Sequence, residues 1–231
     1  MMRLISLILM ILTVVPLSSV SAGGTVWITP DTTYSQRDTS FSLVILCDAD
    51  LAGVKGMELD IDFNGTFIQP DTAYMTLGSV WSSSRPLFNY TYLVNGNSRL
   101  TLDFAVLGDT STISGPGIIM IIPINTVGFG ETDFKIVSYK LRDKANQPMT
   151  MATTGAWVKV CRFVGDLDAD NRVDIADVGG MIDYLYVSFT PPVPPIEVAD
   201  TDCSGSVDIA DLTWLIDYLF ISFSPLCGKC L

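Results

Sequence analysis

The chain contains no histidine among its 231 residues. This absence excludes a serine-histidine-aspartate triad, a cysteine-histidine pair and a zinc ion held by histidine. Any catalytic chemistry would have to use carboxylates, lysine, tyrosine or a metal ion.

Basic residues are also scarce: 13 lysines and arginines stand against 25 aspartates and glutamates, giving a formal net charge of −12. Such an acidic chain is a poor ligand for nucleic acid or for an anionic membrane surface. We therefore expect neither as a partner. The same acidity suits the binding of a hard cation.

No apolar run is long enough to span a bilayer, which needs about 20 residues. The N-terminus has Arg3 and then an apolar run from Leu4 to about Leu17, followed by Val20-Ser21-Ala22. This pattern predicts a signal peptide over residues 1–22, cleaved after Ala22, and a secreted, extracellular protein. Later apolar stretches contain aspartate or alternate with polar residues, so we expect no membrane span.

Cysteine is rare, with five residues in the chain: Cys47, Cys161, Cys203, Cys227 and Cys230. In an exported protein some of them pair, and the odd number leaves at least one thiol free or linked between chains. The Cys227-x-x-Cys230 spacing resembles a redox or metal pair. A disulfide staple that ties the C-terminal tail to the domain, for instance to Cys203, is favoured over that interpretation. The sequence leaves the disulfide connectivity open.

Helical periodicity is lacking over residues 25–160, where apolar and polar residues alternate instead. This period of two predicts strands with one buried face. Turns rich in glycine, proline, asparagine and serine separate them, so an all-β antiparallel sandwich of jelly-roll type is expected. The clearest segments are 41–47, 57–63, 99–106, 134–141 and 155–160, with residues 117–124 apolar throughout and expected to be buried on both faces.

Three carboxylates of this half, Asp60, Asp62 and Asp103, could be imagined as a pair for glycoside hydrolysis. Each occupies an outward position of an alternating strand, so a solvated face is the favoured interpretation. Asn64 and Asn89 each begin a glycosylation sequon, which matters only in a host that glycosylates.

The sequence near the C-terminus contains an internal repeat, with one copy at Val173–Phe189 and the other at Val207–Phe223. Each copy follows an acidic stretch with oxygen side chains at positions 1, 3, 5, 9 and 12 of a loop. Calcium takes six to eight oxygen ligands, and a loop of about 12 residues with this spacing can wrap around it. The sequence thus predicts two calcium ions, held by two matched loops.

The expected ligands follow from these positions, with position 7 offering its backbone carbonyl. Position 6 needs a sharp turn, which Gly205 supplies and which Asn171 tolerates. The predicted ligand residues are Asp166, Asp168, Asp170, Arg172, Asp174 and Asp177 in loop one, and Asp200, Asp202, Ser204, Ser206, Asp208 and Asp211 in loop two.

Each unit is expected to be a loop followed by one helix. A strand and its exit precede loop one, and the proline-rich segment 189–199 before loop two is not expected to be helical. Both helices carry apolar residues at i, i+3, i+4, i+7 and i+11, so the two stripes should pack on each other. The stripes are Val178, Met181, Ile182, Leu185 and Phe189, and Leu212, Leu215, Ile216, Leu219 and Phe223.

The duplicated calcium loop and helix resembles a type I dockerin, the EF-hand-like module that docks to cohesins. The resemblance covers residues 165–225, with repeats at 165–190 and 199–224 and a tail at 226–231. It departs from the family at Asn171, where glycine is usual, and at Gly179-Gly180 within the first helix. Residues 25–160 more loosely resemble a cohesin or a related carbohydrate-binding sandwich, through GMELDIDFN, SRLTLDFAVLG, SGPGIIMIIPI and GAWVKV.

These resemblances imply a secreted, non-catalytic assembly protein. Its dockerin would bind a cohesin-type partner in cellulosome-like, polysaccharide-degrading or cell-surface complexes. The sandwich could itself receive a dockerin, and different partners for the two halves are favoured over head-to-tail self-association. A carbohydrate-binding sandwich displayed by the dockerin is the main alternative, and a small glycoside hydrolase is a weaker one.

A docking face is predicted from the second helix. With its core stripe inward, Trp214 and Ile221 point away from the core with Asp217 beside them, and an outward aromatic is a candidate hot spot. The resemblance adds loop positions 10 and 11, which are Ile175-Ala176 and Ile209-Ala210. Gly180 stands where repeat two has Trp214, so the second repeat is expected to dominate binding. The alternative is that Trp214 folds onto the linker or the sandwich.

Overall fold

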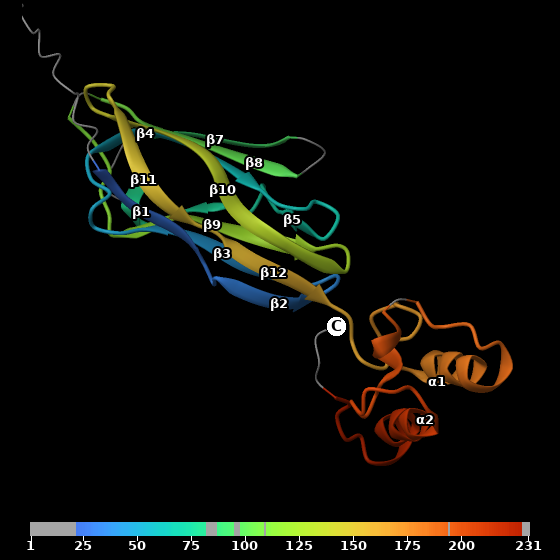
Figure 1. The fold of residues 1–231 in the computed structure, drawn as a ribbon. Coiled ribbons are helices and arrows are strands. Elements are labelled where there is room, and N and C mark those ends of the chain that lie inside the picture. The colour runs from blue at the N-terminus through green and yellow to red at the C-terminus, as the bar shows by residue number, and fades with distance from the viewer. Residues whose placement is uncertain (1–21, 82–86, 95–97, 109, 194, 228–231) are drawn as a thin grey trace, which may run out of the picture.

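A computed structural model describes residues 22–81, 87–94, 98–108, 110–193 and 195–227. The expected signal peptide up to Ser21 and the thiol of Cys230 lie outside these residues, as does the side chain of Asn89. The chain forms a β-sheet region and then a smaller helical region at its C-terminal end (Figure 1). Within the described residues, no helix has the length and apolarity needed to cross a bilayer.

The β region is made of strands, with a 3-10 turn, η1 (Ser79–Trp81), before β7. The strands are β1 (Ala22–Thr29), β2 (Thr32–Gln36), β3 (Ser40–Cys47), β4 (Val54–Asp62), β5 (Ile68–Pro70), β6 (Thr76–Leu77), β7 (Leu87–Val94), β8 (Arg99–Val106), β9 (Gly117–Thr126), β10 (Gly130–Asp143), β11 (Pro148–Thr154) and β12 (Ala156–Cys161).

Hydrogen bonding links the strands in the order β5-β9-β3-β1-β11-β10-β4-β8-β7, with β12 joining β10 to β2. The path folds over on itself into two facing layers, so that β3 and β9 lie opposite β4, β8 and β10 (Figure 1). Most pairs are antiparallel, as expected for this fold class, but β1 with β11 and β2 with β12 are parallel.

Alternation in the sequence correctly places the sandwich core. In β4, Met57, Leu59 and Ile61 are buried and their polar neighbours are not, and facing residues of β8 and β9 complete the same cluster. In β9 the residues that point away from the core, including Ile118 and Ile121, are only half-buried. The expectation that this segment is buried on both faces is therefore met only in part.

The helical region repeats one unit. Helix α1 (Ile175–Ile182) continues into a π-helical turn, η2 (Asp183–Val187), and α2 (Ile209–Ile216) continues into η4 (Asp217–Ile221). A short 3-10 turn, η3 (Ile196–Ala199), precedes loop two. The prediction of no helix in that segment is wrong for these last residues, because they follow Pro195 and escape its restriction.

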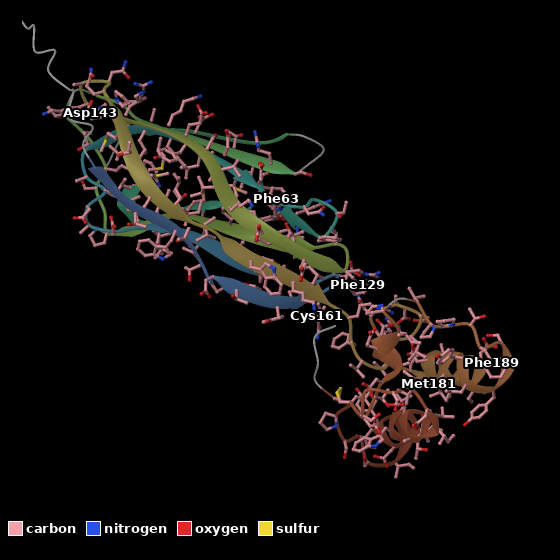
Figure 2. All side chains as sticks on the ribbon, in the orientation of Figure 1. Phe63, Phe129, Asp143, Cys161, Met181 and Phe189 are labelled. Carbon is pink, nitrogen blue, oxygen red and sulfur yellow. A yellow bond between two sulfur atoms is a disulfide. The ribbon has the colours of Figure 1, made fainter. Side chains whose placement is uncertain are left out.

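The two helices pack on each other as predicted, through a core of Leu167, Val178, Met181, Val198, Ala199, Leu212 and Leu215. The outer ends of the predicted stripes are wrong. Phe189, labelled in Figure 2, and Phe223 are 68% and 72% exposed, and Ile182 is exposed as well. The π-helical turns shift the 3.6-residue period, and both phenylalanines follow the helix ends with φ of 55°.

A disulfide joins Cys203 to Cys227, with their Cα atoms 5.9 Å apart, and confirms the favoured staple. Cys161 is disulfide-bonded as well. Cys47 is a free, buried thiol within the sandwich core. The tail is thus tied to loop two, whose second ligand position directly precedes Cys203.

Candidate metal sites and docking face

Two clusters of three carboxylates lie in the helical region. The clusters are Asp166, Asp168 and Asp177 in loop one, and Asp200, Asp202 and Asp211 in loop two. In each cluster, one oxygen from every residue lies within 4.8 Å of the others. These are positions 1, 3 and 12 of the predicted loops, so residues at both ends of each loop are brought together.

Left-handed backbone turns close each loop. Position 6 has a positive φ in both loops, 69° at Asn171 and 93° at Gly205, as predicted. Position 4 also has a positive φ, 67° at Ala169 and 61° at Cys203, which the sequence analysis missed. Alanine and cysteine have no preference for the left-handed region of backbone conformation, so the residue types do not predict the turn at position 4.

The carboxylate at position 1 is held by the far side of its own loop. The backbone N–H of Asn171 donates to Asp166 Oδ2 over 3.3 Å, and that of Gly205 donates to Asp200 Oδ2 over 3.1 Å. The left-handed turn at position 6 aims this N–H inward. Each loop is therefore curled around its first carboxylate.

The carboxylate at position 12 connects the loop to its helix. Asp177 accepts the backbone N–H of Leu167 over 2.6 Å and that of Asp174 over 2.8 Å. In loop two, Asp211 accepts the backbone N–H of Asp202, one position further along the loop than Leu167, over 3.2 Å and that of Asp208 over 2.8 Å. Both aspartates sit in the first turn of a helix, where a negative charge is favoured.

The remaining predicted ligands are not part of the two clusters. Asp174 and Asp208, at position 9, are the N-caps of α1 and α2, and each accepts the N–H two residues on over 2.7 Å. Asp170 accepts the N–H of Arg172 over 2.8 Å. The hydroxyl of Ser204 donates to the carbonyl of Ser206 over 3.2 Å, so positions 5 and 7 bond locally in loop two.

Burial disfavours the charged form in three of the six clustered carboxyls. Burial raises the pKa of the Asp166, Asp177 and Asp211 carboxyls above its ordinary value, because low polarity disfavours the charged form. Asp200 is 7% exposed, and its Oδ1 atom has no hydrogen-bond partner in the described part of the chain. A buried acceptor of this kind, beside two more carboxylates, fits a hard cation with oxygen ligands.

The predicted docking residues lie on the surface. Trp214 is 43% exposed, so it is not folded away under the linker or the sandwich, and Ile221 is exposed while Asp217 is half-buried. The loop pairs Ile175-Ala176 and Ile209-Ala210 are exposed at the start of each helix. Further exposed apolar residues, which the sequence did not predict to be exposed, are Tyr186, Val187, Phe189, Phe220 and Phe223.

The sandwich carboxylates lie on the outward side of their strands. Arg99 forms an ion pair with Asp62 over 2.6 Å. Burial tends to raise the pKa of Asp60, but hydrogen bonds from Ser138 and Thr101 outweigh it and the pKa is lowered. For Asp103, burial and then the charges of Glu58 and Asp60 raise the pKa. Asp60 and Asp62 are thus bound to neighbouring side chains on the sheet surface.

Comparison with known proteins gives one family match. A model of the dockerin type I domain matches residues 164–220, which include both acidic loops, α1 and α2. No curated protein matches the chain.

Several solved structures are similar to the β region. A non-cellulosomal cohesin from the archaeon Archaeoglobus fulgidus is 13% identical over 60% of this chain and 91% of that chain, with a TM-score of 0.47. A chain of a type I cohesin–dockerin complex from Clostridium thermocellum is 10% identical over 59% and 92%, with a TM-score of 0.49. A cohesin module of a Clostridium perfringens family 33 glycoside hydrolase is 11% identical over 60% and 97%, with a TM-score of 0.46.

Proposed function

We propose that the chain is a secreted, non-catalytic assembly protein whose residues 165–225 fold around two calcium ions and dock to a cohesin-type partner. The observation that carries this proposal is the duplicated carboxylate cluster, with its two loop-and-helix units in the segment that matches the dockerin family. A solvated acidic loop would not bury its first and twelfth positions in both copies, as Asp166, Asp177, Asp200 and Asp211 are buried here.

Calcium would be held by Asp166, Asp168 and Asp177 in loop one and by Asp200, Asp202 and Asp211 in loop two. The other predicted ligand positions of each loop would complete the oxygen shell. The ion supplies positive charge to carboxylates that burial alone makes unfavourable. The protein supplies the loop curvature, through position 6, and the attachment to the helix, through position 12.

Docking would use the apolar surface that the helices present to solvent. Trp214 and Ile221, with Asp217 beside them, form its proposed centre in repeat two, and the exposed loop pairs beginning at Ile175 and Ile209 flank it. A large exposed aromatic with aliphatic neighbours is the usual composition of an interface hot spot. Gly180 and Val187 occupy the matching places in repeat one, so we assign the dominant contact to repeat two.

The sandwich would provide a second interaction surface, for a dockerin or another partner in a polysaccharide-degrading or cell-surface complex. Carbohydrate binding by the sandwich would need a row of exposed aromatic side chains. Among the residues whose side chains the structure describes, which leave out those of β7, the exposed aromatics of this region are Tyr34 in β2 and Tyr74 in the turn after β5, and these come from separate elements.

A cohesin pull-down tests the proposal. The full chain should bind an immobilised type I cohesin with calcium and lose that binding with EDTA. Ile221→Ala should weaken capture, whereas Val187→Ala, the matched change in repeat one, should leave it nearly unchanged. Capture that is equal in calcium and EDTA, or equally weakened by both changes, would contradict the assignment.

A further inference from the structure

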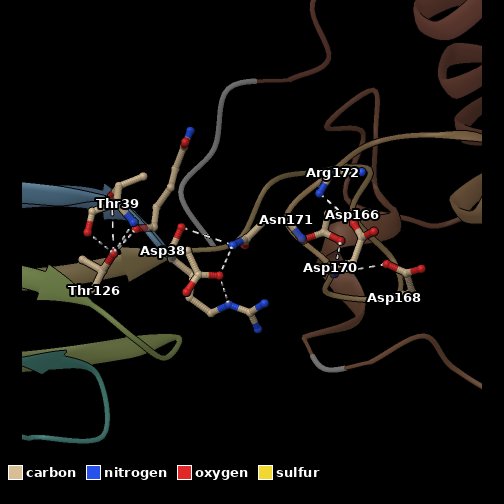
Figure 3. A network of polar contacts seen from close by, with 10 residues as sticks. Asp38, Thr39, Thr126, Asp166, Asp168, Asp170, Asn171 and Arg172 are labelled. Carbon is tan, nitrogen blue, oxygen red and sulfur yellow. Dashed lines mark hydrogen bonds and ion pairs between the residues drawn. The ribbon is translucent and has the colours of Figure 1, made fainter.

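Loop one is in direct contact with the sandwich. The side-chain Nδ2 atom of Asn171 donates to Asp38 Oδ2 over 2.9 Å and to the carbonyl oxygen of Arg37 over 3.2 Å. Arg37 and Asp38 form the turn between β2 and β3. Figure 3 shows Asn171 between this turn and Asp166, the first carboxylate of the loop.

A second line of contacts runs parallel to the first. The ring of Phe129, in the turn between β9 and β10, has the guanidinium of Arg37 at 5.0 Å and that of Arg162 at 5.3 Å. Arg162 is buried, and its Nη2 atom donates to the carbonyl of Asp166 over 2.6 Å. Its Nη1 atom donates to the carbonyl of Val193 in the linker over 2.5 Å. The contacts form a closed ring from the sandwich to loop position 1 and back.

The two loops differ at the residue that makes this contact. In loop two, position 6 is Gly205, and no heavy atom of the described residues lies within 4 Å of the place where its Cβ would stand. An asparagine there would meet solvent. Position 6 therefore reaches the sandwich in loop one alone.

We propose that the β2–β3 and β9–β10 turns of the sandwich form a docking surface for loop one, and that calcium binding in this loop and its contact with the sandwich stabilise each other. Asn171 connects the two events. Its backbone N–H holds the carboxylate of Asp166, and its side chain holds Asp38. A calcium ion that orders loop one also fixes the position of the Asn171 side-chain amide and so strengthens its contact with Asp38. By thermodynamic linkage, this contact must raise the calcium affinity of the loop by the same factor.

The inference rests on the proposed calcium sites, and a site-resolved calcium titration of the full chain tests it. The backbone amides at position 6 of the two loops report each loop separately by NMR. Asp38→Gly removes the sandwich carboxylate at a residue with φ of 57°, which glycine tolerates. Asn171→Gly removes the side-chain amide that donates to Asp38 and keeps the backbone amide that serves as the probe. The variant with both substitutions completes a double-mutant cycle, and Gly205→Asn is the matched control in loop two.

We expect Asp38→Gly and Asn171→Gly each to weaken calcium binding in loop one by about threefold to tenfold, the range of a net hydrogen bond. The double variant should be no weaker than the poorer single variant. Loop two should be unaffected by both changes, and Gly205→Asn should leave loop one unchanged.

Two other outcomes would overturn the inference. An unchanged loop-one affinity in Asp38→Gly would mean that the sandwich does not sense the ion. Additive effects in the cycle would mean that Asp38 acts by long-range charge and not through Asn171. A wild-type chain that binds no calcium would instead overturn the proposed function, and this inference with it.

Discussion

Replacing Asp200 by asparagine should change the stability of the helical region in opposite directions with and without calcium. The Oδ2 atom of Asp200 accepts the N–H of Gly205, whereas Oδ1 is buried without a partner among the described residues. An asparagine can keep the first bond and turn its NH2 group toward the carboxylates of Asp202 and Asp211. In EDTA, removal of the unpaired acceptor and its charge should stabilise the fold by about 1 kcal/mol.

With calcium the order reverses. An ion present at about 100 times its dissociation constant stabilises the folded state by about 2.7 kcal/mol. Asp200→Asn loses the first ligand of loop two and with it most of that gain. The wild type should then be the more stable protein by roughly 2 kcal/mol. This difference is the stabilisation that calcium gives the wild type minus the stabilisation that the substitution gives the variant in EDTA.

Urea unfolding of the full chain, followed by the helical circular dichroism signal, measures both differences. Asp166→Asn is the matched control. Both oxygens of Asp166 accept backbone N–H groups, from Asp170 over 3.1 Å and Asn171 over 3.3 Å, so an NH2 group would face a donor. This variant should gain nothing in EDTA. A loss of stability of Asp200→Asn in EDTA, or a stabilisation of that variant by calcium as large as that of the wild type, would refute this prediction.

Three further predictions concern other parts of the chain. Trp214→Ala should weaken cohesin binding by about 2 kcal/mol or more while leaving the calcium-dependent melt nearly intact, and a collapsed melt would show that Trp214 is structural. Gly179→Ala should raise the melting temperature by stabilising α1 by about 0.5–1 kcal/mol, since outside the backbone of its own helix no heavy atom of the described residues lies within 4 Å of the added Cβ, and a lower temperature would contradict this. Asp60, whose lowered pKa reflects bonds from Ser138 and Thr101 that outweigh burial, should add stability above its unfolded pKa and lose it as pH falls through the lowered value. Asp60→Asn should therefore cost about 1 kcal/mol at neutral pH and progressively less as the pH falls through the lowered pKa, and a cost that does not change with pH would refute the assignment.

Much of the fold follows from local patterns. Alternation identifies β3, β4 and β8 because one face of each strand is buried and a period of two is unambiguous there. The parallel pairing of β1 with β11 has no such local signal, because it joins residues more than a hundred positions apart. The ends of the helical stripes could not be placed either, since a π-helical turn changes the period without a marker in the residue types.

The candidate site was predictable where ligand spacing is strict. Positions 1, 3 and 12 of each loop come together, and the left-handed turn at Asn171 follows from its tolerance of positive φ. Position 9 was assigned to the metal alone, although Asp174 with Asp177 three residues later also forms a capping box. The contact of Asn171 with Asp38 lies between residues 133 positions apart and could only come from the structure.

A calcium titration of the full chain by calorimetry tests the assignment of the two loops most directly. We expect two bound ions per chain, together with a helical signal that melts at a clearly higher temperature in calcium than in EDTA, because buried carboxylates need the ion's charge to be stable. Fewer than two ions, or a melting temperature and helical signal that are the same in calcium and in EDTA, would contradict the assignment of the two loops.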